Sequence, residues 1–272
     1  MKLFKMSIII LFCITFVVFG VVFAVSSLSN DNTIPKITVE SDSIELSVKD
    51  DESKLLEGVT AYDEKDGDIT DKIIVESISR FISGATCKVT YTVCDSDNHV
   101  SSAFRQVTYT DYVPTRIWLK DSLCFSQLQN VKLMDYITAT DVLDGDISNN
   151  IIVTSSDFKD KTIGNYTISL RVTNSVGDTT IREFPVTVEE RSLYAPIIKL
   201  STYVLYTKVG QKINVNNYID GVYTYQGDRT DLDVTVESDI NINQPGVYQA
   251  HYYATDKQGR TGHSILIMNV DE

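Results

Sequence analysis

The sequence predicts an all-β fold: tandem immunoglobulin-like antiparallel β-sandwiches that follow one N-terminal hydrophobic helix. Three observations predict this fold. Val, Ile, Thr and Tyr recur along the chain, and these residue types favour strands. Several segments alternate strictly between apolar and polar residues, as half-buried strands do. Finally, three sequence markers return in the same order with a period of about 80 residues, which indicates repeated modules.

The N-terminal segment, residues 6–25 (MSIIILFCITFVVFGVVFAV), is almost wholly apolar. At a helical rise of about 1.5 Å per residue it would span roughly 30 Å, the thickness of the hydrocarbon core of a bilayer. Lys2 and Lys5 precede this segment and Asp31 follows it. Because positive charge stays on the cytoplasmic side, we expect a membrane segment with the remainder of the chain outside the cell.

Two interpretations of this segment remain open. A cleavable signal peptide would end near Ala24-Val25-Ser26, and the mature protein would be secreted. An uncleaved signal anchor would give a single-pass membrane protein with an extracellular C-terminal region. The anchor is favoured because the apolar run is longer than the roughly 7–15 residues of a usual signal peptide.

The three markers of the repeat divide the exported region into modules. The markers are a Pro that opens an apolar strand, an Asp-Gly-Asp turn, and a Gly before an alternating strand. Their positions are Pro35, Pro114 and Pro196; residues 66–68, 144–146 and the altered 226–228; and Gly84, Gly164 and Gly246. The predicted division is a hydrophobic segment (1–31), two similar modules (32–111 and 112–191) and a more divergent third (192–272), joined by short linkers in an extended series.

Composition excludes several classes of function. The formal net charge of −13 would repel phosphate backbones, so nucleic acid is not an expected partner. The four cysteines have neither the spacing of a disulfide framework nor a CxxC zinc motif. His99, His251 and His263 are expected on loops or outward strand faces in different repeats, with no metal or catalytic role. Because no catalytic motif appears, the chain is not expected to be an enzyme.

Residues 61–70 (AYDEKDGDIT) and 139–148 (ATDVLDGDIS), each followed by a Gly and an alternating strand, carry a specific resemblance. They resemble the bacterial Ig-like modules of Gram-positive surface proteins, a module type also known from a pesticidal crystal protein. The resemblance covers Pro35 to about Glu190, and the third module keeps only part of the pattern. It implies a β-sandwich on the cell surface that acts as a spacer or adhesive module, without catalysis.

Two acidic clusters are the first candidate sites. Each sits on a predicted Asp-Gly turn, and the members are Asp63, Asp66 and Asp68 in the first module and Asp141, Asp144 and Asp146 in the second. Asp favours such turns because its side chain hydrogen-bonds the nearby backbone, and this turn-forming role is the favoured interpretation. Structural calcium is the alternative, because Ca²⁺ accepts clustered carboxylate oxygens. No other cofactor is expected.

Aromatic residues are the second candidate site. Trp118 is the single Trp, and several Tyr residues, among them Tyr223 and Tyr225, are concentrated in the third module. Aromatic rings can anchor a protein interface or stack on a sugar. The predicted function is therefore a non-catalytic, membrane-tethered cell-surface spacer or adhesive protein. The alternative is a carbohydrate- or cell-wall-binding module of an envelope process.

Overall fold

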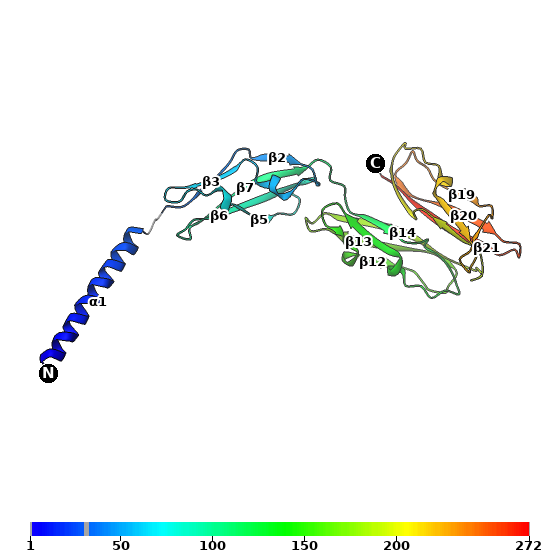
Figure 1. The fold of residues 1–272 in the computed structure, drawn as a ribbon. Coiled ribbons are helices and arrows are strands. Elements are labelled where there is room, and N and C mark those ends of the chain that lie inside the picture. Colours follow the sequence, from blue (N-terminus) through cyan, green and yellow to red (C-terminus); the bar gives the residue numbers. More distant parts are fainter. Residues whose placement is uncertain (1, 30–32, 272) are drawn as a thin grey trace. The chain divides into compact units, whose positions relative to one another are not determined.

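The computed structural model describes the backbone of residues 2–29 and 33–271, and the side chains of residues 10–24 and 33–271. The helix α1 spans Lys2–Ser29 (Figure 1). Its described apolar side chains are exposed; Leu11, Phe12 and Phe19, for example, each expose more than 60% of their surface. Within the described residues, no helix combines the length and the apolarity needed to cross a membrane. The predicted boundary between residues 31 and 32 lies outside the described residues.

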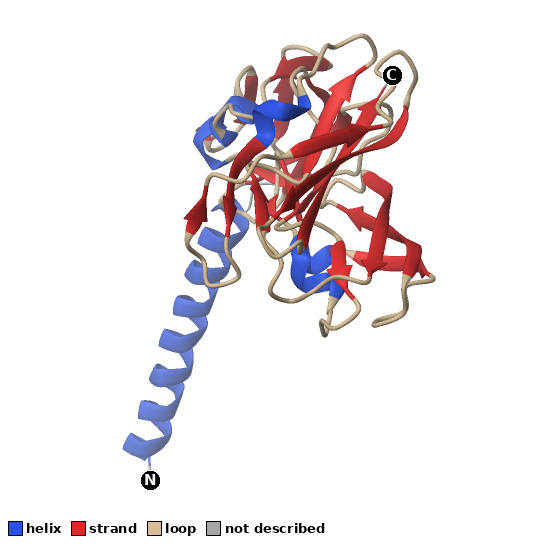
Figure 2. Ribbon diagram, turned by 90° about the vertical axis from the view of Figure 1, so that its right-hand side faces the viewer, coloured by secondary structure: helices blue, strands red, loops and turns tan. Residues whose placement is uncertain are grey.

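Beyond the helix the same pair of sheets occurs three times among the described residues. Strands are the main regular structure there (Figure 2). Each pair has a three-stranded sheet and a four-stranded sheet. In the first sandwich the three-stranded sheet contains β1 (Lys36–Val39), β3 (Val59–Asp63) and β4 (Gly67–Asp68). The four-stranded sheet contains β2 (Ser43–Leu46), β7 (Val100–Tyr109), β6 (Thr86–Cys94) and β5 (Ile74–Ile78).

The second and third sandwiches repeat this arrangement. The second has β8 (Arg116–Leu119), β10 (Ile137–Asp141) and β11 (Gly145–Asp146) in one sheet and β9 (Cys124–Ser126), β14 (Thr179–Glu189), β13 (Gly164–Thr173) and β12 (Ile152–Ser156) in the other. In the third, the three-stranded sheet contains β15 (Ile197–Leu200), β17 (Ile219–Tyr223) and β18 (Arg229–Thr230). Its four-stranded sheet contains β16 (Val204–Lys208), β21 (Thr261–Asp271), β20 (Gly246–Thr255) and β19 (Thr235–Ser238).

The sandwiches are not purely antiparallel. In each one, the chain leaves the first strand, crosses to the other sheet and pairs in parallel with the last strand; these pairs are β2 with β7, β9 with β14 and β16 with β21. All other strand pairs among the described residues are antiparallel. Five short 3₁₀ helices lie between described strands: Glu52–Leu56, Thr70–Lys72, Leu133–Tyr136, Ser148–Asn150 and Val215–Tyr218.

The turns form where the sequence supplies residues that tolerate positive φ. Gly67 and Gly145, the central residues of the two Asp-Gly-Asp turns, have φ values of 76° and 71°. Asn98, in the hairpin between β6 and β7, has a φ of 70°. These conformations are strained for most side chains but accessible to Gly and Asn, so the repeated turns follow directly from the sequence.

The alternating strands bury the faces that their sequences predict. Cys87, Val89 and Tyr91 in β6, like Ile168 and Leu170 in β13, expose at most 2% of their surface. Cys94 points to the opposite side of β6 and is exposed, and both it and Cys87 are free thiols. The fold class is therefore confirmed: the chain consists of immunoglobulin-like β-sandwiches that follow one N-terminal helix.

The chain forms two compact units, Met1–Asp111 and Tyr112–Glu272. The second unit contains both the second and the third sandwich, and one continuous hydrophobic cluster includes buried residues from each of them, such as Leu170 and Ile267. The expected extended series is therefore wrong for these two sandwiches. The predicted division into three separate modules stays a prediction.

Strand β21 shows why these two sandwiches pack together. Residues 262–270 are all buried. A strand with one face toward the core and the other toward solvent would instead alternate between buried and exposed residues. Leu266 lies opposite Ala250 of β20 and faces the core of its own sandwich. Ile265 and Ile267 face the other way, yet both are buried and belong to the cluster that includes residues of the second sandwich. At the edge of the strand, the Ile265 amide donates a hydrogen bond to Ser122 Oγ of the second sandwich at 2.8 Å. Both faces of β21 are therefore covered by protein.

Candidate functional site

The carboxylates of the acidic cluster in the first sandwich accept hydrogen bonds from their own turn and from the adjacent hairpin. Asp63 is 2% exposed, and its Oδ1 accepts hydrogen bonds from the amides of Lys65 (2.9 Å) and Asp66 (3.0 Å). Both oxygens of Asp66 bind Ser96, one to the amide and one to the hydroxyl, at 2.7 Å each. Asp68 accepts from the Thr70 amide at 3.0 Å. These bonds close the turn and tie it to the neighbouring hairpin.

The second sandwich repeats these contacts. Asp141 Oδ1 accepts from the Leu143 amide at 2.9 Å, while its Oδ2 accepts from the Thr115 hydroxyl at 2.6 Å. Asp144 binds the Ser175 amide and hydroxyl, both at 2.6 Å. Asp146 accepts from the Ser148 amide at 3.0 Å. The geometry favours the turn-forming role for all six predicted Asp residues, and calcium binding by these residues stays a prediction.

The Trp118 side chain packs against other residues of the second unit. Its Nε1 donates a hydrogen bond to Thr140 Oγ1 at 2.8 Å, and its ring meets the ring of Tyr206 edge-on, with 5.4 Å between centroids. Tyr206 belongs to β16 of the third sandwich, and its hydroxyl donates to the carbonyl of Ile117 at 2.7 Å. Trp118 therefore contributes to the contact between the two sandwiches.

Tyr223 and Tyr225 line a cleft in the third sandwich. The cleft has a volume of about 460 Å³, and its wall also includes Tyr194, Leu232 and Arg260. The Tyr194 and Tyr225 rings meet edge-on at 5.0 Å, and these two residues remain 58% and 45% exposed. The structure thus brings together two of the three predicted aromatic ligand residues and separates Trp118 from them.

Polar groups of the hairpin after β20 complete this cleft. Arg260 Nε donates to Asp256 Oδ2 at 2.6 Å, and Arg260 Nη2 donates to the side chain of Gln258 at 3.3 Å. Gln226 Nε2 donates to the Tyr225 hydroxyl at 3.1 Å. The guanidinium and the amides are held beside exposed aromatic rings. Such an apolar wall with a few fixed polar groups is typical of small-ligand sites.

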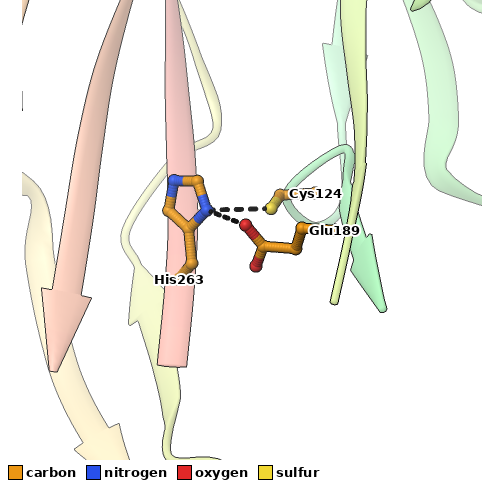
Figure 3. Close-up of side chains that lie close together, drawn as sticks. All are labelled: Cys124, Glu189 and His263. Carbon is orange, nitrogen blue, oxygen red and sulfur yellow. Dashed lines mark hydrogen bonds and ion pairs between the residues drawn. The ribbon is translucent and has the colours of Figure 1, made fainter. Parts of the chain in front are cut away.

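A second cluster was not predicted from the sequence: Cys124, Glu189 and His263 converge in the second unit (Figure 3). His263 Nδ1 lies 3.2 Å from Cys124 Sγ and 2.8 Å from Glu189 Oε2. Cys124 and His263 are buried, and Glu189 is half-buried. From the sequence, His263 is placed on an outward face but is not paired with Cys124 and Glu189, and the expected lack of a metal or catalytic role for the histidines stays a prediction. His263 does lie on an outward strand face, but the second sandwich covers that face.

His251 and Arg191 surround the cluster. His251 Nδ1 lies 3.0 Å from His263 Nε2; the two rings belong to neighbouring strands of the same sandwich, which corrects the expectation that the histidines lie in different repeats. Arg191 Nε forms an ion pair with Glu189 Oε1 at 3.3 Å and its Nη2 donates to the Cys124 carbonyl at 2.7 Å.

Burial is the largest single influence on the pKa values of these side chains. It raises the pKa of the Cys124 thiol well above its usual range, so the thiol is protonated at neutral pH. Burial, with a further contribution from the neighbouring His263, lowers the pKa of His251, so this imidazole is neutral. For Glu189, burial acts to raise the pKa, but hydrogen bonding and charge interaction with His263, together with Arg191, outweigh it and the pKa is lowered.

Comparison with known proteins gives limited similarity. No family model matches the chain. An uncharacterized 81.3 kDa protein of Acholeplasma phage L2 is 29% identical over 130 residues, which cover 46% of this chain and 17% of that protein. The chain therefore spans a small part of this relative, and the alignment does not assign it to a family.

Two solved structures show the level of similarity in fold. One contains CBM51-2, in complex with GlcNAc, and INT domains from Clostridium perfringens ZmpB; it is 18% identical, covers 86% of this chain and 42% of that chain, and has a TM-score of 0.24. Another is Drosophila N-cadherin EC1-4, with 10% identity, coverage of 85% and 74%, and a TM-score of 0.25. Similarity this low assigns neither a ligand nor a partner to this chain.

Proposed function

We propose that this chain is a non-catalytic binding protein of the cell surface, held at the membrane by its N-terminal helix. Its immunoglobulin-like sandwiches act as a spacer and adhesive module of the kind found in Gram-positive surface proteins. The cleft of Tyr194, Tyr223 and Tyr225 in the third sandwich carries the proposal, because it combines exposed aromatic rings with fixed polar groups.

Membrane attachment is supported by the helix itself. Between Ile10 and Phe23 the described side chains of α1 are exposed and, except for Thr15, apolar; the Thr15 hydroxyl donates to backbone carbonyls of the helix. Exposed apolar surface is unfavourable in water and favourable in a bilayer. The flanking Lys2 and Lys5 orient the helix so that the sandwiches lie outside the cell.

The ligand that best fits the cleft is a glycan of the cell envelope. Its volume of about 460 Å³ falls within the range of roughly 300–1,000 Å³ that is typical of small-ligand sites. Tyr rings offer an apolar face for a sugar ring and a hydroxyl at the edge. Arg260 and Gln258 can donate hydrogen bonds to sugar hydroxyls, since both line the same cleft.

The absence of catalysis is supported by the geometry of the Cys124 cluster. A nucleophile–base–acid relay requires the base to contact the nucleophile with one nitrogen and the acid with the other. Here Cys124 and Glu189 both approach Nδ1 of His263, and the other nitrogen faces His251. Proton relay from the thiol to the carboxylate through the imidazole is therefore not available in this arrangement.

Binding of the purified full chain to a glycan array and to isolated cell walls tests the proposal. We expect saturable binding that Tyr225→Ala weakens at least about tenfold, because the exposed ring is a central contact of the cleft. Tyr62→Ala is the matched control, since Tyr62 is an exposed Tyr of the first sandwich and should have no effect. Binding that is absent from both glycan and walls, or that is equal in the two variants, would contradict the glycan assignment.

A protein partner is the second candidate, favoured by the edge-on pair of Tyr194 and Tyr225, a rigid aromatic surface of the type that anchors protein interfaces. Pull-down of a surface protein by the full chain, lost in Tyr225→Ala and kept in Tyr62→Ala, would replace the glycan by a protein ligand at the same cleft.

A further inference from the structure

We propose that Cys124, Glu189 and His263 bind a zinc-type transition-metal dication, which joins the second and third sandwiches. One ligand atom from each residue lies within 4.8 Å of the other two. The three residues offer a sulfur, a carboxylate oxygen and an imidazole nitrogen, the donor types that proteins use for Zn²⁺. The metal replaces the thiol proton of Cys124, which leaves to solvent, so that the sulfur binds as a thiolate. The site is distinct from the aromatic cleft and does not depend on the function proposed there.

The fold places the first two ligands on one face of the same sheet. In the parallel pair of β9 and β14, Cys124 lies opposite Thr187 and Ser126 lies opposite Glu189. Residues that lie opposite each other, and residues two apart in one strand, share a face of the sheet. Cys124 and Glu189 are therefore diagonal neighbours on the outer face, while Phe125 and Val188 fill the core of the second sandwich.

The third ligand comes from the opposing sandwich. His263 lies on β21 and points away from its own core, because its neighbours in the strand, Gly262 and Ser264, pair with the inward residues Ala254 and Tyr252 of β20. The outer face of β21 packs against the second sandwich, so His263 Nδ1 meets Cys124 and Glu189 there (Figure 3). Packing between sandwiches creates the site.

The ligand separations are close to those of a tetrahedral zinc site. With Zn–S near 2.3 Å and Zn–N and Zn–O near 2.1 Å, tetrahedral angles place S and N about 3.6 Å apart and N and O about 3.4 Å apart. The corresponding distances are 3.2 Å between Cys124 and His263 and 2.8 Å between His263 and Glu189. Binding of the ion therefore requires the first separation to widen by about 0.4 Å and the second by about 0.6 Å.

Neighbouring residues orient the ligands as metal sites require. With Nδ1 of His263 on the metal, its Nε2–H can donate to Nδ1 of His251, 3.0 Å away. Such a hydrogen bond fixes the tautomer of a ligating histidine. Arg191 holds Oε1 of Glu189, which leaves Oε2 toward the other ligands.

Access and the fourth ligand come from an adjacent cavity. It has a volume of about 210 Å³, and Cys124, His263, Ser126 and Asp121 are among the residues in its wall. A hydrated ion can reach ligands that face such a cavity, and one retained water would complete the tetrahedron. Because sulfur and nitrogen ligands disfavour Ca²⁺ and Mg²⁺, we expect selectivity for Zn²⁺ and Co²⁺.

The test is titration of the full chain in detergent with Zn²⁺, in competition with a chromophoric chelator, and with Co²⁺, read by its absorption spectrum. We expect one equivalent of Zn²⁺ to bind, a sulfur-to-cobalt charge-transfer band, and tetrahedral d–d bands. The midpoint temperature of unfolding of the second unit should rise by about 5–10 °C when the free Zn²⁺ concentration is 100 times the dissociation constant of the site.

Three variants identify the ligands. Cys124→Ser keeps the size of the side chain and should abolish the charge-transfer band, and Glu189→Gln should weaken Zn²⁺ binding at least about 100-fold. His251→Gln, which changes only the outer partner, should weaken it by about 10–100-fold. Because a metal-free unfolding curve is measured for each variant, loss of binding is separated from loss of folding.

The matched controls are Cys94→Ser and His99→Gln, a free exposed thiol and an imidazole in the first sandwich. Neither should change stoichiometry or affinity. Binding of Zn²⁺ that survives Cys124→Ser and Glu189→Gln unchanged, or that disappears in the controls, would overturn the proposal. So would the absence of Zn²⁺ and Co²⁺ binding to the folded chain, which would identify the cluster as a hydrogen-bonded contact only.

Discussion

Arg105 Nε donates a hydrogen bond of 2.7 Å to the hydroxyl of Tyr91 inside the first sandwich, where the two residues are 1% and 0% exposed. The two Nη atoms donate to the carbonyls of Glu57 and Leu55 at 2.8 and 2.6 Å, and the Tyr91 hydroxyl donates to Leu55 at 2.7 Å. A buried cation is costly unless it is hydrogen-bonded, so this network ties the 3₁₀ segment to β6 and β7.

Tyr91→Phe should lower the free energy of unfolding of the first sandwich by about 1–3 kcal/mol, because it leaves a buried guanidinium nitrogen unpaired. Hydrogen exchange of the β6 and β7 amides measures this change. Tyr62→Phe, at a Tyr that is 61% exposed, is the control and should stay within about 0.5 kcal/mol. Equal effects of the two substitutions would show that the Arg105 network contributes nothing.

Low pH should lower the free energy of unfolding of the first sandwich, in part because the Asp66 carboxylate becomes protonated. Hydrogen bonds from the Ser96 hydroxyl and amide lower the pKa of this carboxyl below its ordinary value of 3.8. Because the folded pKa is the lower one, the stabilisation is present above pH 3.8 and is lost as the pH falls through the folded pKa. Hydrogen exchange of the β6 and β7 amides between about pH 5 and pH 2 should show a weaker acid dependence in Asp66→Asn, and an unchanged acid dependence would contradict the assignment.

Asp144 distinguishes the turn-forming role from calcium binding. Asp144→Ala removes two hydrogen bonds to Ser175 and should lower the unfolding free energy of the second unit by about 1–3 kcal/mol, with or without Ca²⁺. Trp118 fluorescence follows this unfolding, and the exposed Asp160→Ala is the control. A melting point that rises with millimolar Ca²⁺, and rises less in Asp144→Asn, would instead establish the calcium site.

Tyr206→Ala should destabilise the second unit by about 2–4 kcal/mol, since it removes the ring that packs on Trp118 and the hydroxyl that binds Ile117. Trp118 emission should shift toward longer wavelength, because water reaches the indole. Tyr225→Ala, at an exposed position in the cleft, should leave both unchanged while it weakens ligand binding. Loss of ligand binding in Tyr206→Ala, with normal stability, would contradict this division of roles.

The local structure of the sandwiches could be predicted from the sequence because it depends on neighbours along the chain. Alternation in β13 predicts the buried face of Ile168 and Leu170, since successive strand residues face opposite sides. The Asp-Gly-Asp segments predict turns, and Gly67 and Gly145 adopt the positive φ that such turns need. The turn-forming role of Asp63 and Asp141 follows in the same way, because the amides that donate to their Oδ1 atoms lie two and three residues away.

Contacts between sandwiches could not be predicted in this way. The alternation of β21 assigns His263 correctly to the outward face, but only the tertiary structure shows that the second sandwich covers that face. Cys124 and His263 are 139 residues apart, and nothing in a single sequence pairs them. Trp118 likewise looks like a free ligand residue until Tyr206 is placed against it.

The sequence by itself determined which residues form strands, turns and the apolar helix, because periodicity and turn chemistry act over a few residues. Only the tertiary structure decided which outer sheet faces remain exposed to solvent and which are covered by another sandwich, and therefore which polar residues come into contact. The aromatic cleft and the Cys124–Glu189–His263 cluster both depend on that second step, since each is assembled from strands or loops that lie far apart in the chain.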